Sequence, residues 1–226
     1  MNTRITGLLA ALTLAVAVPT AADAMTFLNA GDTGTVTIFG FDKVTEDYVG
    51  SLTADLKFTL LSKTDSKTWN FTYEADNTST DQVARLVSFA LSVDPNFQTV
   101  SGTSGPFTAT AEKKLEDFAT ELCFVAGNNC AGGGNGGLTS AAANATGAFT
   151  LNFKNAPTGS VTFDAFAGKF QATQYNGSSL FAQECPVGQN CGGGGTEVPE
   201  PATWALMIMG FGAAGAMLRR RRTAFA

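Results

Sequence analysis

The chain has 226 residues, a net charge of −5, four cysteines, 18 phenylalanines and no histidine. The absence of histidine excludes Ser-His-Asp and Cys-His catalysis, and it excludes a zinc or haem site ligated by histidine. A negative net charge argues against nucleic-acid binding, because neutralising phosphates requires a basic surface. The apolar fraction of 44% suits a globular protein with one sizeable core.

Residues 1–24 have the pattern of a secretory signal peptide. Arg4 supplies the positive charge, residues 5–18 are small or apolar throughout, and Ala22-Asp23-Ala24 gives the small-x-small end. The apolar stretch is shorter than the roughly 20 residues that a membrane-spanning helix needs. We therefore expect cleavage between Ala24 and Met25. The alternative is a short buried N-terminal helix.

Residues 25–191 are expected to form one exported domain, in which period-two alternation of apolar and polar residues predicts β-strands. The clearest patterns lie at residues 52–60, 69–74, 87–93 and 149–153. Weaker patterns lie at residues 35–41, 161–166, 170–175 and 179–182, with Asn176-Gly177 predicting a tight turn between the last two. Only residues 111–122 have helical spacing. The expected fold class is therefore all-β, an antiparallel β-sandwich with Gly-rich loops.

Most of the phenylalanines occupy the apolar positions of these strands. An aromatic ring buries a large apolar area there, so we expect the phenylalanines to form the core. The alternative is a row of exposed aromatic side chains that serves as a platform for sugars.

The cysteines fall into two local pairs. Cys123 and Cys130 bracket six residues, and Cys185 and Cys191 bracket five. In an oxidising compartment such cysteines form disulfides, and pairing within each local pair closes the smallest loops, although three connectivities are open. A metal site with all four cysteines as ligands is the alternative, with spacings wider than the usual two to four residues. We expect disulfides, and neither a metal nor another cofactor.

The C-terminal region has four successive features. Residues 192–198 begin with four glycines and predict a flexible linker. The triplet Pro199-Glu200-Pro201 interrupts regular secondary structure. Residues 202–218 carry no charge and predict a membrane helix about 25 Å long. The arginines that follow mark its cytoplasmic end, and they are Arg219, Arg220, Arg221 and Arg222.

These C-terminal features resemble the PEP-CTERM sorting signal in its PEPxxWA variant. The matching residues are Pro199, Glu200, Pro201, Trp204 and Ala205, followed by the apolar helix and the arginine cluster. The resemblance, which spans residues 199–222, implies a Gram-negative exported protein that an exosortase processes near the triplet. Such systems usually accompany exopolysaccharide or biofilm genes. The alternative is a plain single-span anchor with the same topology.

A second resemblance covers most of residues 50–182. The order TWNFTYEADNTS, ARLVSFALSVDPN, NCAGGGNGGL and FTLNFKNAPTGSVTFDAFAGKFQATQYNGSSL is similar to the cistern family of PEP-CTERM proteins. This resemblance implies no activity and no site.

Two acidic clusters are candidates for catalytic or cation-binding carboxylates. They comprise Asp42, Glu46 and Asp47, and Glu116, Asp117 and Glu121. Glycosidases need two carboxyl groups that face each other across a cleft, which proximity in sequence does not establish. The Asp-x-Asp-x-Asp-Gly spacing of calcium loops is absent. We expect both clusters to be solvated surface groups, and we assign no catalytic residue.

The sequence therefore predicts a non-enzymatic protein that is exported across the inner membrane and held there transiently by its C-terminal helix. Its expected destination, after exosortase processing, is the cell surface or extracellular matrix, with a link to exopolysaccharide or biofilm. Residues 25–198 contain nine basic and 17 acidic side chains, a net charge of about −8 that disfavours nucleic acid as a partner. The alternatives are a carbohydrate-binding module of the envelope and, with less support, a secreted glycoside-active enzyme that uses carboxylates.

Overall fold

In a computed structural model, the chain is described at residues 24–111, 115, 118, 120–127, 129–130, 136–142, 144–171, 179–185 and 191. These residues belong to a compact unit that ends at Cys191. The described residues form twelve strands: β1 (Met25–Phe27), β2 (Thr33–Asp42), β3 (Asp47–Lys63), β4 (Thr68–Asp76), β5 (Arg85–Asp94), β6 (Thr99–Ser101), β7 (Thr108–Thr110), β8 (Leu122–Val125), β9 (Leu138–Thr139), β10 (Ala145–Asn152), β11 (Val161–Gln171) and β12 (Ser179–Glu184).

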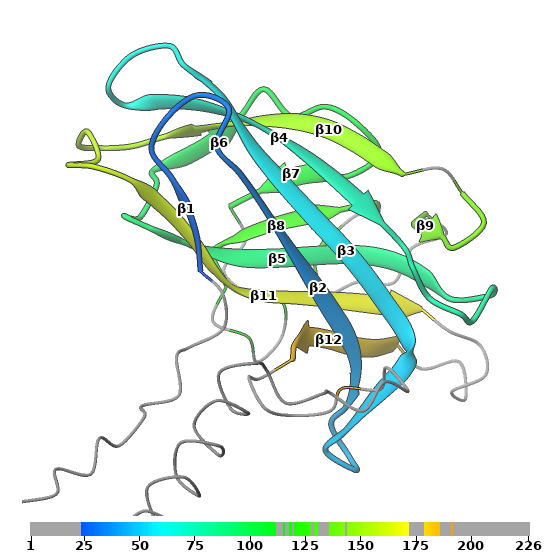
Figure 1. The fold of residues 1–226 in the computed structure, drawn as a ribbon. Helices are drawn as coiled ribbons and strands as arrows, with labels where there is room; N and C mark the ends of the chain where they lie inside the picture. Colours follow the sequence, from blue (N-terminus) through cyan, green and yellow to red (C-terminus); the bar gives the residue numbers. More distant parts are fainter. Residues whose placement is uncertain are drawn as a thin grey trace, which may run out of the picture. The chain divides into compact units, whose positions relative to one another are not determined.

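All the strand pairs are antiparallel and belong to one sheet, with the order β6-β10-β4-β3-β2-β12-β11-β5-β8-β7. Strand β1 adds to β11, and β9 adds to β5. Figure 1 shows β2 and β3 crossing over β5, β8 and β11, so the sheet folds back on itself as a barrel-like sandwich. The expected all-β antiparallel class is confirmed for the described residues.

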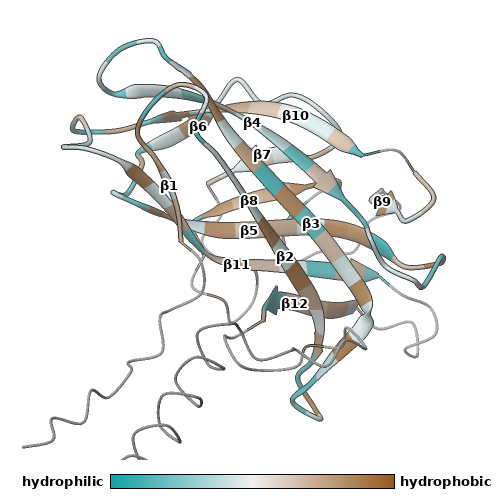
Figure 2. Ribbon diagram, in the orientation of Figure 1, coloured by the Kyte–Doolittle hydropathy of each residue, from teal (hydrophilic) through white to brown (hydrophobic). Residues whose placement is uncertain are grey.

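Alternating side chains turn one face of the sheet inward. In β3, Leu52, Ala54, Leu56, Phe58 and Leu60 are fully buried, whereas the residues between them are partly or fully exposed. Figure 2 shows hydrophobic and hydrophilic residues alternating along this strand. One face of the sheet therefore supplies the core and the other meets solvent or covering loops.

Phenylalanine rings fill the core. Phe58 lies at its centre, with its ring centroid 5.8 Å from that of Phe124, 5.5 Å from that of Phe163 and 6.3 Å from that of Phe89. These partners come from β8, β11 and β5, so the contacts join the two halves of the folded sheet. The expectation that phenylalanine forms the core is confirmed for most of the described rings, whereas Phe39, Phe41 and Phe118 are only partly buried and lie outside this core.

Strand β11 differs from the expectation of two separate strands at residues 161–166 and 170–175. The register against β5 shifts between Asp164 and Ala167, and Ala165 has a positive φ of 50°. Phe163 and Phe166 are both buried in the core although their spacing is odd. The bulge interrupts the period-two pattern and thereby makes one continuous strand look like two.

Antiparallel pairing of β11 with β12 begins at Gln171 and Ser179. The predicted Asn176-Gly177 turn lies between them, outside the described residues.

The predicted helix at residues 111–122 is not seen where the chain is described. Leu122 begins β8, and Leu115 pairs with Phe118 in an isolated antiparallel bridge. Residues 112–114, 116, 117 and 119 lie outside the described residues. The described residues include no helix long and apolar enough to cross a membrane, and the predicted membrane segment at 202–218 is outside them.

Two disulfides join the cysteines locally, Cys123 with Cys130 and Cys185 with Cys191. Local pairing is therefore confirmed, and the alternative of a metal site with four cysteine ligands is wrong. The first disulfide belongs to a second apolar cluster, formed by Ala90, Leu115, Cys123, Val125, Cys130 and Ala167. The second disulfide follows directly after β12.

We expect the substitution Phe58→Ala to lower the free energy of unfolding by about 3–5 kcal/mol, because it removes a fully buried ring and leaves a cavity. Urea unfolding of the full chain in detergent measures this change. Leu61→Ala, on the same strand but at a side chain that is 59% exposed, is the matched control, with an expected change within about 0.5 kcal/mol. Equal effects of the two variants would contradict the central position of Phe58.

We expect replacement of both Cys123 and Cys130 by alanine to lower the free energy of unfolding by about 2–3 kcal/mol, because the disulfide restricts the unfolded chain. The measurement is urea unfolding under non-reducing conditions. A reducing agent should bring the parent chain toward the variant. A variant as stable as the oxidised parent would show that this disulfide adds nothing.

Candidate functional site

The two outer faces of the folded sheet differ. Over β5, β8 and β11, the second apolar cluster covers the outer side, with Phe118 packed against it. Ser88, which is fully buried on this side, donates a hydrogen bond from its hydroxyl to the Cys130 carbonyl oxygen (3.0 Å). The disulfide-closed segment from Cys123 to Cys130 thus helps to cover this face, which makes it a poor candidate for a binding surface.

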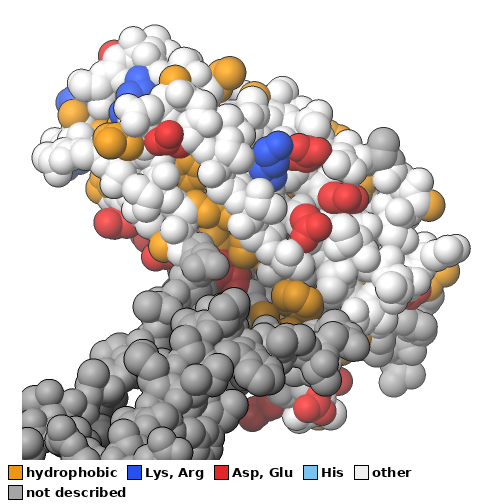
Figure 3. Space-filling view, in the orientation of Figure 1, with side chains coloured by type: hydrophobic (Ala, Val, Ile, Leu, Met, Phe, Trp, Pro, Cys, Tyr) orange, Lys and Arg blue, Asp and Glu red, His pale blue; other side chains and the backbone are white. Residues whose placement is uncertain are grey.

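The outer face of β3, β4 and β10 carries polar side chains. Neighbouring positions across the strands are Thr59, Thr72 and Ala148 in one row and Lys57, Glu74 and Thr146 in the next. Figure 3 shows a face on which polar, uncharged side chains and backbone predominate, with acidic and basic groups scattered among them.

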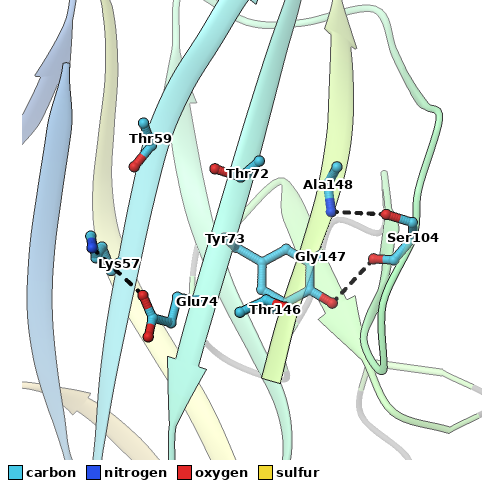
Figure 4. A pocket seen from close by; sticks show the side chains of 9 residues that line it. All are labelled: Lys57, Thr59, Thr72, Tyr73, Glu74, Ser104, Thr146, Gly147 and Ala148. Carbon is cyan, nitrogen blue, oxygen red and sulfur yellow. Dashed lines mark hydrogen bonds and ion pairs between the residues drawn. The ribbon is translucent and has the colours of Figure 1, made fainter. Parts of the chain in front are cut away.

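A groove with a volume of about 470 Å³ lies on this face. Strands β3, β4 and β10 form its floor, and Ser104 lines it from the segment that connects β6 to β7 (Figure 4). The Ser104 backbone N–H donates to the Ala148 carbonyl oxygen (2.9 Å), and the Ala148 N–H donates to the Ser104 hydroxyl (3.1 Å). These paired bonds hold the wall of the groove against β10.

Tyr73 supports the wall from inside. Its hydroxyl donates to the Phe107 carbonyl oxygen (2.8 Å) and accepts from the Phe107 N–H (3.0 Å). Burial raises the pKa of the Tyr73 hydroxyl above its ordinary value of 10, so it remains a donor at physiological pH.

Gly147 lets the connecting segment approach β10 closely. A Cβ atom at this position would lie 2.1 Å from the Ser104 carbonyl oxygen and 2.5 Å from the Tyr73 ring. Any larger residue would therefore displace the wall.

An ion pair joins two strands within the groove. Lys57 Nζ lies 3.6 Å from Glu74 Oε2, and the Asn144 amide donates to Glu74 Oε1 at 2.7 Å. The Asn144 hydrogen bond, with a smaller contribution from the Lys57 charge, holds the pKa of Glu74 below its ordinary value of 4.5. Glu74 is therefore ionised and paired at neutral pH.

Three threonine hydroxyls line the groove, and they differ in whether they bond to another residue of the protein. Thr59 shares a hydrogen bond with Thr33 (2.9 Å between their hydroxyl oxygens). Among the interactions of the described residues, the hydroxyls of Thr72 and Thr146 have no protein partner. These two groups are available to a molecule in the groove.

The residues predicted to have functional roles lie elsewhere. Pro199, Glu200, Pro201, Trp204, Ala205 and the arginines at 219–222 are outside the described residues. Ala24 and Met25, at the expected cleavage site, lie at the start of the described chain, where Met25 begins β1 and is buried. Cleavage there stays a prediction.

The first acidic cluster lies at the connection between β2 and β3. Asp42 and Asp47 are opposite each other in the register, and Glu46 has a positive φ of 58°. Glu46 and Asp47 are exposed. In the described part of the chain, no group of three acidic or cysteine side chains is placed to hold a metal ion. Of the second cluster, Glu116 and Asp117 are outside the described residues, whereas Glu121 lines a separate pocket of about 260 Å³ with Phe97.

Sequence reasoning did not find the groove. Its residues alternate with core residues along β3, β4 and β10, and the period-two pattern marks them only as outward-facing. Which residues of neighbouring strands lie opposite each other depends on the register of the strands, and the alternation of apolar and polar residues does not predict that register. The segment 102–107, which reads GTSGPF, contains no recognisable motif.

Comparison with known proteins identifies the C-terminal region. The family model of the PEP-CTERM protein-sorting motif matches residues 197–222. No curated protein gives a significant match to the chain. Among solved structures, the chain is similar to the KRT10-binding region domain of the pneumococcal serine rich repeat protein PsrP, with 15% identity, coverage of 76% of this chain and 97% of that chain, and a TM-score of 0.27. The resemblance of residues 50–182 to the cistern family stays a prediction.

We expect Asn144→Ala to raise the pKa of Glu74 toward 4.5, because the variant removes the hydrogen bond that favours the carboxylate. In the parent chain this group stabilises the fold above pH 4.5, and the stabilisation is lost as the pH falls through the lowered pKa. NMR titration of the Glu74 carboxyl carbon measures the change. Asn152→Ala is the control, since Asn152 bonds to Thr99 and Ser101 instead; an equal shift in this variant would contradict the assignment.

Proposed function

We propose that this chain, which carries a PEP-CTERM protein-sorting motif, is a non-enzymatic extracellular protein that an exosortase delivers to the cell surface or matrix. The observation that carries the proposal is the match of the motif to residues 197–222. This motif implies processing by an exosortase and supports attachment to the inner membrane through the C-terminal segment before release. The signal peptide expected at residues 1–24 agrees with the same route.

The described domain supports a structural or binding role. It forms a sandwich with a large aromatic core and two disulfides, and the disulfides suit an oxidising exterior. The lining of its polar groove includes one carboxyl group, that of Glu74, whereas acid–base hydrolysis of glycosides uses two. The lowered pKa of Glu74 also makes it a poor proton donor at neutral pH.

A place in an exopolysaccharide matrix or biofilm is part of this proposal. A protein with a net charge of about −8 over residues 25–198 stays soluble outside the cell. The polar outer face of β3, β4 and β10 offers hydrogen-bonding groups to a hydrated matrix. A carbohydrate-binding role is the second candidate, favoured by the same groove.

The sorting part of the proposal is tested by replacing Pro199, Glu200 and Pro201 with alanines in a host that contains the exosortase. We expect the processed form to fall to background and the full-length chain to accumulate in the membrane fraction. Immunoblotting with an antiserum against the domain follows both forms without altering the chain.

Thr196→Ala, just outside the matched motif, is the control and should be processed like the parent chain. Unchanged processing of the triple alanine variant would overturn the sorting assignment.

A further inference from the structure

We propose that the groove over β3, β4 and β10 binds a neutral glycan chain through hydrogen bonds alone. The inference rests on the proposed function only for the compartment in which the glycan is met. The binding chemistry comes from the groove itself.

The first argument is the kind of group that lines the groove. Thr72 and Thr146 present hydroxyls without protein partners among the described contacts, and each can both donate and accept. A sugar hydroxyl has the same dual character, so it satisfies such a group without the charge that an ammonium or carboxylate ligand would bring. Lys57 and Glu74, beside them, add one donor and one acceptor.

The second argument is charge. Lys57 and Glu74 are paired at 3.6 Å, so together they bring no net charge to the groove. The Asn144 hydrogen bond holds the pKa of Glu74 below its ordinary value of 4.5, so Glu74 is ionised at neutral pH. For a uronate, sulfate or phosphate group on a ligand, attraction to Lys57 would be offset by the Glu74 carboxylate, and the net negative charge of the domain would repel the group. A neutral chain meets neither penalty.

The third argument is rigidity. The floor of the groove consists of residues in strands, and its wall is fastened by the reciprocal bonds between Ser104 and Ala148 and by the Tyr73 hydroxyl. Little order is lost when a ligand binds such a surface, which favours binding by a few hydrogen bonds. The volume of about 470 Å³ lies in the range of small-molecule sites.

Among the described residues that line the groove, Tyr73 is the aromatic one and it is buried, so binding there does not use an aromatic platform. The described aromatic residues of β3, β4 and β10 that line the core are buried and pack on each other. Each site therefore relies on hydrogen bonds whose net contributions are small, and useful retention comes from repeated engagement of one long chain by many protein copies. This suits a matrix protein better than a high-affinity receptor.

The test is titration calorimetry on the full chain in detergent with neutral hexasaccharides derived from dextran, cellulose and laminarin, and with an alginate hexasaccharide as the anionic comparison. We expect at least one neutral probe to bind and the alginate probe to bind more weakly. The double substitution Thr72→Val and Thr146→Val keeps side-chain shape and removes both hydroxyls. It should weaken binding about tenfold.

Thr26→Val, on β1 and therefore away from the groove, is the matched control and should leave the affinity unchanged. Circular dichroism verifies that all variants fold. The proposal is overturned if no neutral probe binds, if alginate binds best, or if the double variant binds like the parent chain. Because the unprocessed chain is used, failure of exosortase processing leaves this result intact, and failure of glycan binding leaves the sorting assignment intact.

Discussion

Packing of phenylalanine rings around Phe58 is the interaction on which the rest of this structure depends. Rings from β3, β5, β8, β10 and β11 meet there, and each lies in a strand whose alternate residues point the other way. With one face of the sheet committed to this core, every polar residue between the core positions must lie outside. The core therefore decides which residues of each strand form the outer faces.

One outer face is covered and the other is open, because the connections between the strands differ. The segment that follows β7 and the loop closed by Cys123 and Cys130 bring apolar residues over β5 and β11, where a small second core forms. The connection between β6 and β7 passes instead beside β10. There Ser104 forms two hydrogen bonds with Ala148 of β10. It leaves the middle of the polar face open as a groove.

This arrangement assigns separate tasks to separate parts of the chain. The PEP-CTERM protein-sorting motif lies at residues 197–222. The polar groove lies in the described domain, on the outer face of β3, β4 and β10. Strand β12 pairs with both β2 and β11 and ends beside the disulfide between Cys185 and Cys191. The last strand of the domain is therefore held on both sides before the chain continues toward its sorting signal.

Much of the fold was predictable from sequence, since alternation in residues 52–60, 69–74, 87–93 and 149–153 reports directly which side chains are buried. Local cysteine pairing was also predictable, because short loops close at the lowest entropic cost. Strand β11 was predicted as two pieces, because the bulge at Ala165 changes the phase of the pattern. The prediction of a helix at residues 111–122 is wrong at Leu122, because this residue pairs with Leu91 of β5 and belongs to a strand.

By itself, the sequence determined the β class, the aromatic core and the sorting motif, because each depends on residues that are near in the chain, whereas the structure decided among the three possible cysteine pairings. Tertiary structure alone decided the groove. Lys57, Glu74 and Thr146 come from three strands, and only the register of those strands makes them neighbours. The absence of histidine excludes many enzymes but does not bear on this groove. The groove would bind a neutral ligand through hydroxyl groups and one ion pair, and neither requires a histidine.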